Sequence, residues 1–103
     1  MNTEMTIAEL REVNAMSFKG FSIMDASTSR LKEICMQALN RIDDYQQQAG
    51  EKGIAVLEGY LSVTYSEVEK AYRHLNEGGL ISMSSRNELR FLLKEVEKSI
   101  VLL

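Results

Sequence analysis

The chain has 103 residues, of which 45% are hydrophobic and 26% are charged, and its formal net charge at pH 7 is -3. This composition indicates one folded domain, excludes wholesale disorder, and argues against a protein that binds polyanions non-specifically through excess positive charge. The single cysteine, Cys35, cannot form an internal disulfide, and one cysteine with one histidine cannot build a structural zinc site.

Residues 1–27 differ in pattern from the rest of the chain. Thr6 and Glu9 have the spacing of a capping box, which predicts a short helix near residues 7–16. A loop or extended arm follows, and its large apolar residues lack helical spacing: Phe18, Phe21, Ile23 and Met24. Two interpretations stay open, because the arm can fold over the core of its own chain or dock on a partner protein.

A regular apolar pattern begins near residue 29 and predicts a first main helix over residues 29–49. Apolar side chains recur there every three or four residues: Leu31, Cys35, Ala38, Ile42 and Tyr45. Ser27, Thr28 or Ser29 can cap the start of this helix through a side-chain hydroxyl. We expect Gly50 to close its end in the left-handed conformation.

A second stripe predicts a helix over residues 53–77, which ends where Gly78 and Gly79 follow each other. Its stripe keeps the spacing of three and four throughout: Ile54, Leu57, Leu61, Thr64, Val68, Ala71 and Leu75. Further apolar residues widen this face: Val56, Tyr60, Val63 and Tyr72. We therefore expect this helix to contact more than one neighbour.

A third stripe predicts a helix over residues 86–102, which a capping box formed by Ser85 and Glu88 would start. The stripe consists of Leu89, Leu93, Val96, Ile100 and Leu103, and Phe91 and Leu92 add a second apolar flank. Because the last four residues are all apolar, we expect the C-terminus to pack inside the fold or against another chain.

These elements predict an all-α protein, a small antiparallel helical bundle or hairpin with three main helices over residues 28–103. The short helix and the apolar arm form a separate segment over residues 1–27. No apolar run is long enough to cross a membrane, and the N-terminus lacks the pattern of a signal peptide. We therefore expect a reduced, cytoplasmic setting and no membrane contact.

Three short helices cannot readily cover all the apolar surface that the sequence predicts. This surface comes from the apolar arm, the wide second helix and the apolar C-terminus. This surplus favours a small acidic helical module that binds a protein, as an adaptor, an inhibitor or a chaperone-like regulator. The partner would be a second copy, giving a homodimer, or a different helical chain. The candidate contact residues are Phe18, Phe21, Ile23, Met24, Tyr60, Tyr72, Ile100, Val101, Leu102 and Leu103.

Residues with catalytic chemistry are sparse, so we expect no enzyme, no cofactor and no metal. His74 is expected at the end of a helix, facing Glu77, and Cys35 falls on an apolar stripe, where it acts as a small buried hydrophobe. Asp43 and Asp44 are adjacent and point about 100° apart on a helix, which is poor geometry for a shared carboxylate site.

An alternative comes from residues 61–81, which begin Leu-Ser-Val-Thr-Tyr-Ser-Glu-Val and end Asn-Glu-Gly-Gly-Leu-Ile. This stretch resembles the helix-turn-helix of GntR-type winged-helix transcription regulators. The resemblance implies a helix-turn-helix near residues 57–81, a wing through residues 89–91, and contacts to DNA from Thr64, Tyr65, Ser66 and Lys70. Residues 51–78 carry three basic and five acidic side chains, however, and the stripe crosses residues 62–64 without a break. Both observations favour the helical bundle.

Overall fold

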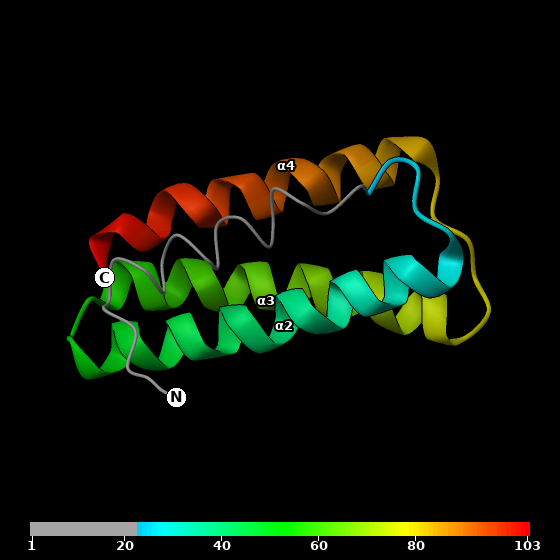
Figure 1. The fold of residues 1–103 in the computed structure, drawn as a ribbon. Helices are drawn as coiled ribbons and strands as arrows, with labels where there is room; N and C mark the ends of the chain where they lie inside the picture. The colour runs from blue at the N-terminus through cyan, green and yellow to red at the C-terminus, as the bar shows by residue number, and fades with distance from the viewer. Residues whose placement is uncertain (1–22) are drawn as a thin grey trace, which may run out of the picture.

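The structure is a computed structural model that describes residues 23–103 (Figure 1). Over these residues the predicted all-α fold is confirmed, since helices are the only regular elements. Their bounds are Thr28–Glu51 for α2, Ala55–Asn76 for α3, Met83–Ser99 for α4 and Ile100–Leu102 for the 3₁₀-helix η1. The helix expected over residues 7–16 and the candidate residues Phe18 and Phe21 lie outside the described residues. None of the described helices is long and apolar enough to span a membrane.

The helices α2 and α3 pack closely side by side, and α4 lies along them with a smaller contact to α3 (Figure 1). Two side chains, those of Lys52 and Arg86, form hydrogen bonds with residues that are distant in the sequence. The Lys52 ammonium, in the α2–α3 turn, donates to the carbonyl oxygen of Leu103. The Arg86 guanidinium, in the first turn of α4, donates to the carbonyl oxygens of Ile23 and Ala26, which precede α2.

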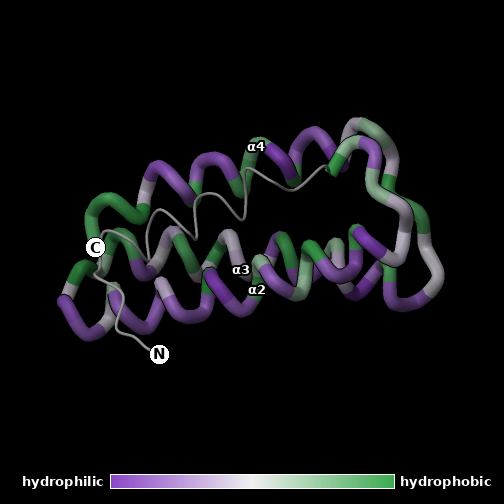
Figure 2. Tube along the Cα trace, viewed as in Figure 1, coloured by the Kyte–Doolittle hydropathy of each residue, from purple (hydrophilic) through white to green (hydrophobic). Residues whose placement is uncertain are grey.

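The core lies between the three helices, and their outward faces are mainly hydrophilic (Figure 2). The predicted stripe of α2 is wholly buried, and Ile34, Leu39 and Ala49 widen it. From the stripes of α3 and α4 the buried members are Leu57, Leu61, Thr64, Val68, Leu75, Leu89, Leu93 and Val96. Ile54 and Ala71 are half-buried against this core. The apolar spacing in the sequence therefore predicted which face of each helix is buried.

The cap at the start of α2 is one of those predicted from the sequence, and the cap at the start of α4 is not. The Ser27 hydroxyl accepts a hydrogen bond of 3.1 Å from the Arg30 amide, as expected for one of the three predicted caps. The predicted capping box at Ser85 is wrong, because α4 begins at Met83 and its cap is Ser82. The Ser82 hydroxyl accepts from the Ser85 amide at 3.1 Å, so the cap lies one helical turn earlier.

The turn between α2 and α3 also differs from its prediction. Gly50 does not close α2, which continues to Glu51; Gly53 adopts the left-handed conformation instead, with φ 70°. The turn is closed by the Ile54 amide, which donates to the Ala49 carbonyl oxygen at 2.9 Å. At the end of α3 the prediction is confirmed, since Gly78 has φ 87°.

Replacing Gly53 by alanine is expected to lower the free energy of unfolding by about 1–2 kcal/mol. A Cβ at Gly53 would contact no other group within 4 Å, so the loss reflects only its positive φ. Gly59 is the matched control, because it lies inside α3 and its added Cβ would also meet nothing within 4 Å. Gly59→Ala is expected to raise the free energy of unfolding by about 0.5–1 kcal/mol. Urea denaturation that gave both variants the same sign would contradict this account of the turn.

At both ends of the described chain apolar side chains pack into the fold, which is one of the two alternatives predicted for the arm and for the C-terminus. Ile23, Ile100 and Leu103 are buried in the core of their own chain. For Ile23 this matches the interpretation in which the arm folds over its own chain, and Met24 beside it is half-buried. These three buried residues are therefore not available to a partner, and the surplus of apolar surface is smaller than expected. The exposed candidates at the C-terminus are Val101 and Leu102.

The structural context of a helix-turn-helix is missing from the described residues. Helix α3 runs through residues 62–64 without a break, where the turn was required. Residues 89–91, expected in a wing, lie inside α4. The arrangement that the GntR resemblance implied is therefore wrong for this chain, because the unbroken apolar stripe of α3 favours one continuous helix.

Candidate functional site

An open groove separates α3 from α4. Two adjoining cavities, of about 400 Å³ and about 460 Å³, form it and share the lining residues Glu67, Glu88 and Leu92. The groove exists because α4 contacts α3 less closely than α2 does. We call the whole feature the α3–α4 groove.

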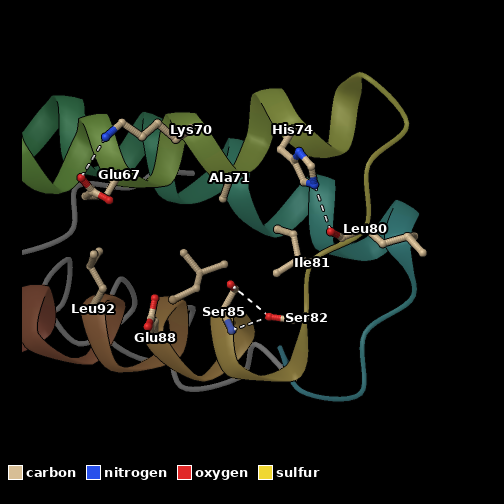
Figure 3. A pocket seen from close by; sticks show the side chains of 11 residues that line it. Glu67, Lys70, Ala71, His74, Leu80, Ile81, Ser82, Ser85, Glu88 and Leu92 are labelled. Carbon is tan, nitrogen blue, oxygen red and sulfur yellow. Dashed lines mark hydrogen bonds and ion pairs between the residues drawn. The ribbon is translucent and has the colours of Figure 1, made fainter.

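The first cavity lies at the end of the groove nearest the connection between the two helices (Figure 3). Ile81, from this connection, lies between α3 and α4. On the α3 wall the Lys70 ammonium pairs with the Glu67 carboxylate at 3.3 Å. On the α4 wall the Ser82 hydroxyl donates to the Ser85 hydroxyl at 3.1 Å.

His74 fixes the backbone of the connection and does not face Glu77 as expected. Its Nε2 lies 3.0 Å from the carbonyl oxygen of Leu80, at hydrogen-bond distance. A Cβ on Gly79 would come within 2.4 Å of the same nitrogen, so the ring occupies space that only glycine leaves open. The His74 ring therefore contacts the backbone of the loop beside the groove.

The second cavity is lined by apolar side chains from both helices. Tyr60 and Val63 come from α3 and are 37% and 65% exposed, and Phe91 comes from α4 and is 63% exposed. Leu92, half-buried, completes the apolar lining. Aromatic and branched side chains exposed together on two helices are typical of a surface that binds another protein.

The charged residues that line the second cavity are all acidic: Glu67, Glu88 and Glu95. Burial raises the pKa of the Tyr60 hydroxyl; a hydrogen bond with Thr64 opposes this shift, and the negative charge of Glu95 adds to it. Tyr60 is on α3 and Glu95 is on α4, so the carboxylate acts electrostatically across the groove. The apolar floor of this cavity is therefore bordered by negative charge.

Other residues singled out from the sequence do not share this site. Tyr72 is half-buried against the core, and Val101 and Leu102 lie at the C-terminus. The four candidates for DNA contact do not form one exposed face. Thr64 is buried, and its hydroxyl donates to the Tyr60 carbonyl oxygen at 3.0 Å. Lys70 is exposed and pairs with Glu67 at 3.3 Å.

Sequence reasoning found one wall of the groove and missed the other. Tyr60 and Val63 were recognised as a widening of the apolar face of α3, and only Tyr60 was named as a contact residue. Phe91 was recognised as a second flank of its helix and was not connected with Tyr60. Glu88 was assigned to a helix cap, and Glu95 was not singled out. The sequence does contain a signal for this site, because α3 and α4 each carry a second apolar flank beside the main stripe.

The groups with nucleophilic or metal-binding chemistry lie elsewhere or apart from each other. Cys35 is completely buried in α2, and this burial raises the pKa of its thiol to about 11, so it is protonated at neutral pH. Among residues 23–103, no three His, Cys, Asp or Glu side chains are grouped so that they could hold a metal ion.

No protein-family model matches the chain, and no curated protein or solved structure matches it either. The function is therefore inferred from the shape, the exposed side chains and the charge of the α3–α4 groove.

Proposed function

We propose that this protein is a small helical protein-binding module of the cytoplasm, which holds a partner protein in the α3–α4 groove. In this proposal the three helices form an antiparallel bundle that keeps the groove rigid, and the module acts as an adaptor, an inhibitor or a chaperone-like regulator. The observation that carries the proposal is the exposure of Tyr60, Val63 and Phe91 around one apolar cavity.

The groove offers a partner the features of a binding hot spot. Tyr60 and Phe91 are large, rigid aromatic side chains on α-helices. Ordering them when a partner binds therefore costs little conformational entropy. The cavity between them can receive an apolar side chain from the partner. The carboxylates at its border remain accessible to solvent, as is usual for the rim of an interface.

Association through the chain ends was the contact expected from the sequence, and the burial of Ile23, Ile100 and Leu103 weakens it. Val101 and Leu102 remain exposed and are close to the α2–α3 turn, since Leu103 accepts a hydrogen bond from Lys52. The groove is the better candidate because it combines apolar residues from two helices with a cavity.

Photo-crosslinking tests the proposal directly. p-Benzoylphenylalanine placed at Phe91 in the native host should form an adduct with another protein. The matched control is the same amino acid at Met36, which is 48% exposed on α2 and does not line the groove. The adduct should disappear when Val63→Asp is added, because a carboxylate in the apolar wall disfavours burial. Adducts of equal yield from Phe91 and Met36, or none from Phe91, would reject the groove as the binding surface.

A further inference from the structure

We propose that the occupant of the α3–α4 groove is an amphipathic α-helix of a different protein, with lysine or arginine residues beside its apolar stripe. This inference rests on the proposed function and adds the chemistry of the partner. The length of the groove, the position of its apolar side chains and the charge along its borders all suit such a helix.

The length of the groove suits a helix of three to four turns. Its lining on α3 extends from Tyr60 to His74, and its lining on α4 extends from Ser82 to Glu95. At a rise of 1.5 Å per residue, each wall is about 20 Å long, the length of a helix of about 13 residues. A helix that lies between two others can bury one face against both walls at once.

The apolar side chains of the groove are spaced to receive a helical stripe. Tyr60 and Val63 lie on adjacent turns of one wall, and Phe91 and Leu92 face the same cavity from the other wall. Ile81 supplies an apolar contact at the end near the connection. Anchors on a partner helix at positions i, i+3 or i+4, and i+7 would meet these residues in turn.

The borders of the groove supply the charge complementarity. Its lining holds three carboxylates, from Glu67, Glu88 and Glu95, and one ammonium group, that of Lys70. Glu67 pairs with Lys70 at 3.3 Å, and Glu95 pairs with Lys98 at 3.1 Å. Both pairs are solvent-exposed and therefore weak, so their carboxylates can also interact with cations of a partner. Glu88 forms no ion pair with any described residue.

The same charges disfavour the two occupants that this chain could itself provide. A second copy that presented its groove symmetrically would bring Glu67, Glu88 and Glu95 close to the same three carboxylates. Residues 1–22 carry three acidic and two basic side chains, so they do not supply a positive excess either. A basic helix from another protein satisfies both the apolar lining and the negative border.

Three labelled helical peptides of about 16 residues test the inference on the full-length protein. They share one leucine stripe and carry lysine, glutamine or glutamate at the positions beside it. Fluorescence anisotropy should rank their affinities lysine, glutamine, glutamate, with about a tenfold difference between the extremes at about 0.05 M salt. This difference should shrink at about 0.5 M salt, because exposed charges are screened.

Variants assign the binding to the groove. Val63→Asp should abolish binding of the lysine peptide, and circular dichroism should show that the exposed substitution leaves the helices intact. Glu88→Lys combined with Glu95→Lys should reverse the ranking of the lysine and glutamate peptides. Asp44→Lys, an exposed charge reversal on α2 outside the groove, should leave the ranking unchanged.

Several outcomes would overturn the inference. They are failure of all three peptides to bind, a lysine peptide with no advantage, and binding that survives Val63→Asp. Competition by a peptide of residues 1–22 would identify the chain's own segment as the occupant, and a dimer that Val63→Asp dissociates would identify a second copy. If crosslinking at Phe91 captures a partner whose bound helix is acidic, the proposed function stands and this inference fails.

Discussion

Replacing Leu61 by alanine is expected to lower the free energy of unfolding by about 2–5 kcal/mol. Leu61 is 0% exposed and belongs to the stripe that α3 buries in the core between the helices. Truncation removes apolar contacts and leaves a cavity that the surrounding helices can close only in part. Urea denaturation followed by circular dichroism measures the change.

Val63→Ala is the matched control for this prediction. Val63 lies two residues further along α3, and 65% of its surface is already exposed. Its truncation should change the free energy of unfolding by no more than about 0.5 kcal/mol. A control variant as unstable as Leu61→Ala would mean that α3 buries a different face, and the groove would then be placed wrongly as well.

The helices could be predicted because their burial repeats along the sequence. Leu31, Leu61 and Leu93 each lie in a stripe with a spacing of three and four, and each is buried. The spacing reflects the 3.6-residue period of an α-helix, which acts within one segment and needs no knowledge of its neighbours. The same continuity explains why α3 does not bend at residues 62–64, where the resemblance to a helix-turn-helix required a turn.

The ends of the helices could not all be predicted, because neighbouring residues offered the same chemistry. Ser82 and Ser85 can both cap a helix, and the structure uses Ser82. Gly50 and Gly53 can both adopt a positive φ, and only Gly53 does. In each case the choice depends on how the connection joins two packed helices, and this is a property of the tertiary structure.

The groove could be predicted only in part, for the same reason. The second apolar flanks of α3 and α4 indicate that each helix has a further apolar surface, but nothing in their spacing states how far apart the two helices lie, so the sequence does not place Tyr60 and Phe91 around one cavity. The burial of Ile100 and Leu103 likewise depends on the C-terminus meeting the α2–α3 turn, where Lys52 binds it. Contacts between residues distant in sequence decided both features.

Replacing Arg86 by alanine is expected to lower the free energy of unfolding by about 2–3 kcal/mol. Nothing in the sequence pattern indicated a structural role for this residue. One guanidinium nitrogen of Arg86 lies 2.8 Å from the Ile23 carbonyl oxygen and 2.7 Å from that of Ala26. A third contact, to the Met24 carbonyl oxygen, is longer at 3.4 Å. Truncation leaves these partly buried acceptors without a charged donor, and such bonds contribute more than neutral ones.

Arg90→Ala is the control, since Arg90 lies one turn further along α4, is exposed, and donates to the Asn87 side chain at 2.7 Å. It should change the free energy of unfolding by no more than about 0.5 kcal/mol. Amide exchange should separate local from global effects, because losing Arg86 should speed exchange in residues 24–27 more than within α2. Equal destabilisation by Arg86→Ala and Arg90→Ala, with unchanged exchange at residues 24–27, would show that Arg86 does not hold this segment. The confirming result would mean that α4 fixes the start of α2 through one side chain, which also keeps Ile23 in the core.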